Sequence, residues 1–277
     1  EIIKIGSNLL KEKEIPSFIL DSEILLSKTL KKSREEILTN LNQKVHPKEI
    51  LIFKKYLKRR SYNEPIAYIL GEKEFCSKNF IINKDTLIPR PETELLVEEL
   101  IKIYKEKKIV ILDIGTGSGC IILSLLSTLQ KSLGIGVDIS KNAIKTAKKN
   151  AHKLELAKKI KFLNLSFESV FYKKFDLIVS NPPYIEKRQI KNLSDDIKKY
   201  EPIMALDGGN DGLDLIKKII YKSKYILKTN GMLAIEIGNG QYNKVSTILK
   251  RNNFKIEHII KDYKKNVRCI ISMCLNK

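Results

Sequence analysis

From Pro91 onward, short apolar runs alternate regularly with helical segments, and this alternation constrains the fold more than any other feature. Runs rich in Ile, Leu and Val are typical of strands buried on both faces of a parallel sheet. Helix-length crossovers separate the first five runs, as parallel neighbours require. Only a short turn joins the last two, so we expect the final strand to be antiparallel. We predict an α/β fold with a doubly wound sheet of seven strands, at 109–112, 134–137, 160–165, 175–179, 232–237, 255–260 and 268–273.

The first 72 residues follow a different pattern, with helix signals and little strand. Ser33 followed by Glu36 is a capping box, and Pro47 stands where an expected helix begins. A chain of 277 residues is long enough for two domains. We therefore expect a helical domain over residues 1–72, a β-hairpin linker over 73–90 with its turn around Lys78-Asn79, and the sheet domain over 91–277.

A glycine-rich loop follows the first expected strand of the sheet domain. Asp113 precedes Gly115, Gly117 and Gly119, and a helical segment comes next. Glycines at this place allow a tight turn and let backbone N–H groups approach a ligand. The second strand ends in Asp138, about twenty residues past the first glycine, where a carboxylate can hold a ribose diol. This order indicates a nucleoside-bearing cofactor.

Two classes of cofactor compete for this loop. A dinucleotide site prefers G-x-G-x-x-G/A, and counted from Gly115 its last position is Cys120, which is a mild departure. The carboxylate of Asp113 suits a cationic amino-acid head better than a pyrophosphate. The residues therefore favour S-adenosylmethionine over a dinucleotide.

The segment Asn181-Pro182-Pro183-Tyr184 follows the strand expected at 175–179. It thus lies at the carboxyl end of a strand, where open α/β sheets bind their ligands. The two prolines have no N–H group, so nearby carbonyls are left free to accept hydrogen bonds. An amide side chain, a free carbonyl and an aromatic ring together suit a flat, neutral group that carries an NH2. That group is an amide or the exocyclic amine of a base, unless the segment is only a rigid loop.

Six motifs in order along the chain extend this pattern: Leu87 to Glu94, Leu112 to Cys120, Ser180 to Ile185, Tyr200 to Pro202, Asp207 to Leu213 and Glu236 to Gly238. With these motifs the chain resembles the HemK/PrmC family of protein-(glutamine-N5) methyltransferases, which modify peptide-chain release factors. The resemblance implies methyl transfer from S-adenosylmethionine to the glutamine of the Gly-Gly-Gln motif in class I release factors, in support of translation termination.

The resemblance also implies roles for individual residues. Asp113 and the loop of Gly115, Thr116, Gly117, Ser118 and Gly119 would hold the methionine part of the cofactor, Asp138 the ribose and Phe167 the adenine. Ser166 stands where the family commonly has an acid. Asn181, Pro182 and Tyr184 form the expected catalytic set, Asn181 also bordering the cofactor and Pro183 completing the substrate site. Glu201 and Glu236 receive no role, while Arg90 and Glu92 would either close the pocket or join the domains.

Three alternatives remain open. An adenine-N6 nucleic-acid methyltransferase would share the chemistry of Asn181 and Tyr184, but it would need a target-reading domain and base flipping. Glutamine methylation of a ribosomal protein is close to the main prediction. A noncatalytic module that binds a translation partner would not need Asp113, Asp138 and Asn181.

Composition limits the partners. The net charge of +20 is compatible with binding to a polyanion. The best candidate for such a contact is a basic cluster on one expected helix, formed by Lys54, Lys55, Lys58, Arg59 and Arg60. A run of charges like this is usually a solvated helix face. The four cysteines have no metal-ligand spacing, and we expect no bound metal. No apolar run reaches the ~20 residues of a membrane span.

We expect a monomer in a bacterial-type cytoplasm without a stable nucleic-acid partner. Organellar targeting is left open because the sequence begins with Glu.

Overall fold

The structure is a computed structural model, and it describes residues 1–40, 44–171 and 175–275. The chain forms two compact units. Unit 1 consists of residues 1–72 and 194–200, and unit 2 consists of residues 73–193 and 201–277. Among the described residues, none of the helices is both long and apolar enough to cross a membrane.

Unit 1 is a helical bundle, as predicted. Gly6, in the first helix, lets the second and fourth helices approach closely, because a Cβ atom there would lie 2.5 Å from Ser22 Oγ and 2.8 Å from the ring of Phe53. The predicted capping box of Ser33 and Glu36 is present. The helices are α1 (Ile2–Glu12), α2 (Phe18–Leu30), α3 (Arg34–Thr39), α4 (Pro47–Ser61), α5 (Ile66–Leu70) and α9 (Asp195–Tyr200).

A hairpin of β1 (Glu72–Phe75) and β2 (Lys78–Ile81) follows. Its turn is at Cys76-Ser77, both with positive φ, so the turn predicted around Lys78-Asn79 is wrong. Asparagine tolerates positive φ better than cysteine or serine does. Tertiary contacts override that preference here, because the side chain of Asn150 accepts from the N–H of Ile81 and donates to its carbonyl. These bonds hold β2 extended, and the turn forms before it.

Unit 2 is built on a seven-stranded sheet with the order β5-β4-β3-β6-β7-β9-β8. The pairs from β5 to β7 are parallel, and β9 is antiparallel to both of its neighbours. The predicted doubly wound sheet and its antiparallel last strand are confirmed. The strands are β3 (Val110–Ile114), β4 (Leu133–Asp138), β5 (Ile160–Asn164), β6 (Phe175–Ser180), β7 (Leu227–Glu236), β8 (Phe254–Lys261) and β9 (Val267–Cys274).

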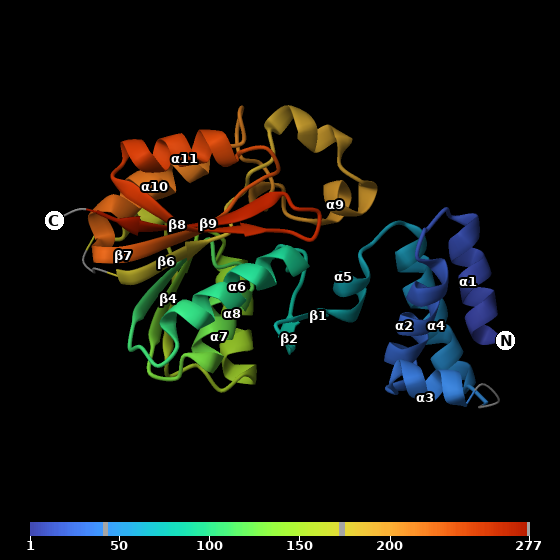
Figure 1. The fold of residues 1–277 in the computed structure, drawn as a ribbon. Coiled ribbons are helices and arrows are strands. Elements are labelled where there is room, and N and C mark those ends of the chain that lie inside the picture. The colour runs from blue at the N-terminus through green and yellow to red at the C-terminus, as the bar shows by residue number, and fades with distance from the viewer. Residues whose placement is uncertain (41–43, 172–174, 276–277) are drawn as a thin grey trace. The chain divides into compact units, whose positions relative to one another are not determined.

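Helices cover both faces of this sheet (Figure 1). One hydrophobic core packs beneath α6 (Pro91–Tyr104), α7 (Cys120–Thr128) and α8 (Lys141–Lys153). The other packs beneath α10 (Asp214–Ile226) and α11 (Tyr242–Arg251). β4 and β5 lie on one side of β3, and the chain then crosses back so that β6 lies on the other side of β3. The loops after β3 and β6 therefore diverge at a switch point, where such sheets bind ligands.

Candidate active site

A cavity of about 560 Å³ opens at the carboxyl ends of β3, β4 and β6. Its wall contains nine of the residues predicted for the site: Gly115, Thr116, Gly117, Ser118, Asp138, Phe167, Asn181, Pro182 and Pro183. Asp113, Gly119 and Tyr184 are not in the wall. The structure thus gathers the two motifs, some sixty residues apart in sequence, around one space.

The glycine-rich loop presents its backbone to this space. Gly115 and Gly117 have positive φ, and a Cβ at Gly115 would meet no atom within 4 Å. The N–H groups of Gly115 and Thr116 both donate to the carbonyl of Val137. Gly119 has another role, since a Cβ there would press on Leu123, Phe162 and Ala147 at 3.1–3.3 Å. It allows the helix to pack closely on the sheet.

Asp113 lies buried behind this loop. Its Oδ2 accepts a hydrogen bond of 2.7 Å from Thr116 Oγ1, while its Oδ1 has no hydrogen-bond partner among the described residues. Burial raises the pKa of the Asp113 carboxyl to about 7. The hydroxyl of Ser118, a residue of the wall, is likewise buried without a partner in the described part of the chain. A buried polar atom without a hydrogen-bond partner costs free energy. Asp113 Oδ1 and Ser118 Oγ are therefore suited to a ligand with a cationic group that donates hydrogen bonds.

Asp138 connects the loop to the cavity. Its Oδ2 accepts from the N–H of Gly117 at 2.9 Å, and its Oδ1 accepts from the N–H of Ser140 at 2.8 Å. Burial raises the pKa of this carboxyl, and the backbone bonds oppose the rise. Each carboxylate oxygen keeps a further lone pair, so the group can accept from two ribose hydroxyls while it holds the loop.

Phe167 lines the cavity from the short 3-10 helix η1 (Phe167–Ser169). Ser166 Oγ accepts from the N–H of Glu168 at 3.3 Å and so caps this turn. Glu168 also belongs to the wall. Position 166 thus has a serine in place of the acid common in the family, and the nearest acid in the sequence is Glu168, whose exposed side chain pairs with Lys218 at 3.7 Å.

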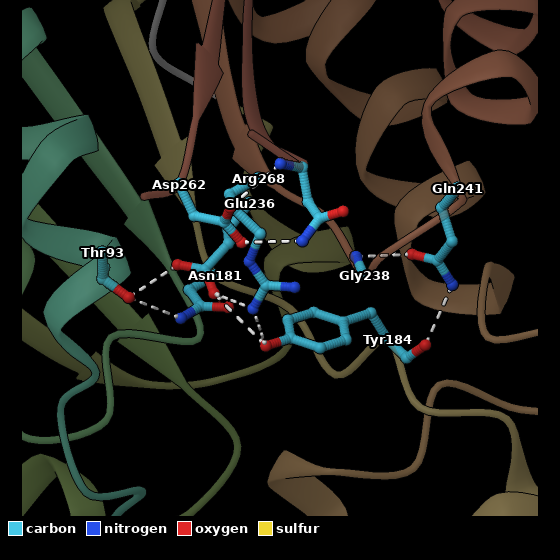
Figure 2. A network of polar contacts seen from close by, with 9 residues as sticks. Thr93, Asn181, Tyr184, Glu236, Gly238, Gln241, Asp262 and Arg268 are labelled. Atoms are coloured by element: carbon cyan, nitrogen blue, oxygen red, sulfur yellow. Dashed lines mark hydrogen bonds and ion pairs between the residues drawn. The ribbon is translucent and has the colours of Figure 1, made fainter. Parts of the chain in front are cut away.

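Asn181 stands at one end of a line of polar contacts (Figure 2). Its Nδ2 donates to Thr93 Oγ1 at 3.2 Å. The hydroxyl of Thr93 donates to Glu236 Oε2 at 2.6 Å. Glu236 is fully buried at the carboxyl end of β7, and burial raises its pKa against the bond from Thr93 and the charge of Arg268. Thr93 and Asn181 both line the cavity.

Tyr184 takes part in the other end of this line. Its hydroxyl donates to Glu236 Oε1 at 3.3 Å and accepts from Arg268 Nη2 at 3.1 Å (Figure 2). The guanidinium of Arg268 lies 5.5 Å from the centre of the ring. Burial raises the pKa of Tyr184 to about 12, so the phenol is neutral. This ring therefore supports the segment from outside the cavity wall in this structure.

The backbone after Tyr184 is held by a glycine-rich segment. Gln241 Nε2 donates to the carbonyls of Tyr184 and Gly212, at 2.9 and 3.2 Å. A Cβ at Gly212 would lie 2.4 Å from the oxygen of Tyr184, so no larger residue fits there. The motif from Asp207 to Leu213 thus keeps the Asn-Pro-Pro-Tyr segment in place.

The motifs alone left several partners unassigned. Thr93 lies inside the motif Leu87 to Glu94, in which the sequence indicates roles only for Arg90 and Glu92. Arg268 and Gln241 lie in no motif and carry no sequence signal. Glu201 binds Arg90 at 2.6 Å, and Arg90 lines the cavity, which favours a role at the pocket. In the predicted basic cluster two arginines are already paired, Arg59 with Glu64 and Arg60 with Asp21.

The chain is similar to known proteins over nearly its whole length. The family model described as the PrmC N-terminal domain matches residues 1–71, and that of the methyltransferase small domain matches residues 90–199. The release factor glutamine methyltransferase of Clostridium acetobutylicum is 39% identical over 272 residues, covering 96% of this chain and 95% of that protein. Its counterpart in Buchnera aphidicola is 40% identical, covering 99% and 98%.

Solved structures share the fold. The hMettl16 catalytic domain in complex with an RNA hairpin superposes with a TM-score of 0.59 at 17% identity, covering 83% of this chain and 81% of that chain. The ribosomal protein L11 methylase of Lactobacillus delbrueckii superposes with a TM-score of 0.51 at 20% identity, covering 70% and 84%.

A doubly wound sheet that carries this loop and this cavity is that of an S-adenosylmethionine-dependent methyltransferase, and S-adenosylmethionine is its cofactor. Its relatives identify the family more closely. The chain belongs to the release factor glutamine methyltransferases.

From the raised pKa of Asp113 we predict that the affinity for the cofactor depends on pH. The cofactor carries a sulfonium and an ammonium cation, and a nearby cation favours an ionised carboxylate. Because the pKa of Asp113 is about 7 without the cofactor, binding below that pH should release a proton. Affinity should therefore rise as the pH increases to about 7 and level off above it. Calorimetry in buffers of different ionisation enthalpy measures the proton released.

Asp113→Asn is the control, since it keeps the size of the side chain and should remove this pH dependence. In the ligand-free protein the folded state holds the Asp113 proton to higher pH than the unfolded chain does, so the contribution of Asp113 to the free energy of unfolding should fall as pH rises from about 4 to about 7, and Asp113→Asn should lack this contribution. An affinity that stays constant across this range would contradict a link between Asp113 and the cofactor.

Proposed function

We propose that this chain transfers a methyl group from S-adenosylmethionine to the side-chain amide nitrogen of the glutamine in the Gly-Gly-Gln motif of class I peptide-chain release factors. One observation carries the proposal. Asn181 and Pro182 share a cavity with the glycine-rich loop, in a chain about 40% identical to release factor glutamine methyltransferases over nearly its whole length.

The chemistry requires alignment above all. Bound in the cavity, S-adenosylmethionine supplies an electrophilic methyl group on a positively charged sulfur. An amide nitrogen is a poor nucleophile because its lone pair is delocalised into the carbonyl. Asn181 Oδ1 and the carbonyl of Pro182 would accept from its two N–H groups and direct the lone pair toward the methyl. Positioning of this kind can contribute ~7–11 kcal/mol.

The same two acceptors would stabilise the positive charge that develops on the nitrogen during attack. The proton can leave to water once the nitrogen is alkylated, so no dedicated general base is needed. Pro182, Pro183, Ile203 and Met204 give the cavity an apolar side, which helps to exclude water from the reacting atoms.

Unit 1 is proposed to bind the release factor, with residues 73–90 as the linker to the catalytic domain. Its match to the PrmC N-terminal domain supports this role. Three exposed lysines of α4, Lys54, Lys55 and Lys58, offer a positive surface to a protein partner. We further propose that the enzyme acts as a monomer in the cytoplasm, without a stable nucleic-acid partner.

Charge reversal on α4 tests the proposed role of unit 1. Lys54→Glu with Lys55→Glu should lower kcat/KM for a release factor about tenfold and flatten its dependence on salt, because both lysines would attract the partner through solvent. Cofactor affinity should not change. Lys148→Glu with Lys149→Glu on α8 is the matched control, since these lysines are also exposed. Equal losses in both variants would mean that only the overall charge matters.

The activity itself is tested with labelled S-adenosylmethionine and three substrates: a purified class I release factor, the same factor with the motif glutamine changed to asparagine, and isolated ribosomes. Label should enter the first substrate only and should resist nuclease. Label in ribosomal protein would favour that substrate instead. Nuclease-sensitive label would mean that the target is a nucleic acid.

A further inference from the structure

The hydrogen bonds around Thr93 determine the direction in which each group donates. A hydroxyl has a single hydrogen to donate. In Thr93 it is directed to Glu236 Oε2 at 2.6 Å, and the other oxygen of that carboxyl also accepts, from the hydroxyl of Tyr184. The oxygen of Thr93 can therefore only accept from Asn181, at 3.2 Å. A carboxamide that donates with its nitrogen on one side must present its oxygen on the other.

The far side of Glu236 supports this direction. Its Oε1 accepts from the hydroxyl of Tyr184 and lies 3.9 Å from Arg268 Nη2. Both neighbours favour a negatively charged oxygen at this position, although burial raises the pKa of Glu236. The guanidinium can reach it because β9 is antiparallel to β7, with Cys269 paired to Glu236. The start of β9 thus lies at the same edge of the sheet as the end of β7.

We propose that Thr93 is a positioning residue which, held by the buried carboxylate of Glu236, fixes the side-chain amide of Asn181 with its oxygen toward the substrate. The inference rests on the proposed function, in which that oxygen accepts from the NH2 of the target amide. A reversed Asn181 would place its own NH2 against the substrate NH2, where two donors face each other.

The arrangement also explains selectivity for an amide. A site with a fixed acceptor binds a group that can donate, and it repels a carboxylate, which has only lone pairs to offer. Thr93 therefore helps the enzyme to distinguish glutamine from glutamate, although it does not touch the reacting atoms.

Three variants test the role of Thr93. Thr93→Val keeps the shape but removes the hydroxyl, and it should lower kcat about 10–100-fold, by analogy with the loss of a hydrogen-bond partner that orients a metal-ligating side chain. Thr93→Ser keeps the hydroxyl and should restore kcat to within about threefold of wild type. In both variants the affinity for S-adenosylmethionine should stay within about twofold, because Thr93 orients only Asn181.

Glu236→Gln reverses the polarity with almost no change in size. The glutamine should direct its oxygen to Tyr184 and Arg268, and hence its NH2 to Thr93. Thr93 would then donate to Asn181 and turn the amide around, so kcat should fall as far as in Thr93→Val. This variant also decides the matter if Thr93→Val does not fold.

The outcomes separate this inference from the proposed function. If the wild-type enzyme does not methylate a release factor, the proposed function has failed. If the wild type is active and folded Thr93→Val keeps a normal kcat, only the positioning role is overturned. Loss of kcat in Thr93→Ser as great as in Thr93→Val would likewise overturn it, because the hydroxyl would then not be the part that matters.

Discussion

Asn181→Ala is expected to lower single-turnover methyl transfer to a release factor by about 10²–10³-fold, the usual cost of removing one preorganised hydrogen-bond partner of the transition state. The fold and the cofactor affinity should be largely unchanged, since Asn181 is assigned to the substrate and its bond partner Thr93 keeps its own bond to Glu236. Rapid-quench measurement of the first turnover, with thermal unfolding as the folding control, checks this.

Asn181→Asp sharpens the test. Aspartate keeps an acceptor oxygen but has no N–H group to donate to Thr93, whose own hydrogen is directed to Glu236. It would also place a second negative charge near that buried carboxylate. The loss should therefore be as great as with alanine. Near-normal turnover by folded Asn181→Ala would mean that the Asn-Pro-Pro-Tyr segment is only a rigid loop.

Asp138→Ala should weaken the binding of S-adenosylmethionine about 100-fold. Hydrogen bonds to a charged group contribute ~1.5–3 kcal/mol each, and two ribose hydroxyls would lose their acceptor. The substitution also removes the bonds that hold the N–H groups of Gly117 and Ser140. Isothermal calorimetry measures the change, with Glu106→Ala, an exposed acid outside the cavity, as the control.

A pair of ligands separates the ribose from the loop. Wild-type protein should bind adenosine more tightly than 2′,3′-dideoxyadenosine, because only adenosine has both hydroxyls. In Asp138→Ala this preference should disappear, whatever happens to the loop. A variant that keeps the full preference would place the ribose elsewhere.

Much of the fold could be predicted because local patterns carry it. A strand occurs at each of the seven predicted apolar runs, and the central strands are apolar because both of their faces are buried. β7 begins at Leu227 and not at the predicted residue 232, because residues 228–230 are polar and exposed and carry no apolar signal. The hairpin turn was wrong by two residues because Asn150, far away in sequence, holds β2 extended. Local turn preference could not reveal a bond across 69 residues.

In the candidate site, too, some residues could be predicted from local motifs and others could not. Its loop glycines, Asp138 and Asn181 each follow a strand directly, so their motifs placed them at one edge of the sheet before the strand order was known. Thr93, Gln241 and Arg268 follow no such rule. Each acts through a partner in another part of the chain, and Thr93 binds Asn181 across 88 residues and Glu236 across 143.

By itself the sequence determined the class of fold, the loop for the cofactor and the segment for an NH2-bearing substrate, because strand periodicity and glycine-rich turns are local properties of the chain. Only the tertiary structure decided which way the amide of Asn181 faces. That direction depends on a buried carboxylate and a guanidinium brought together by the order of β6, β7 and β9, and the pairing of strands is set by the packing of the whole sheet.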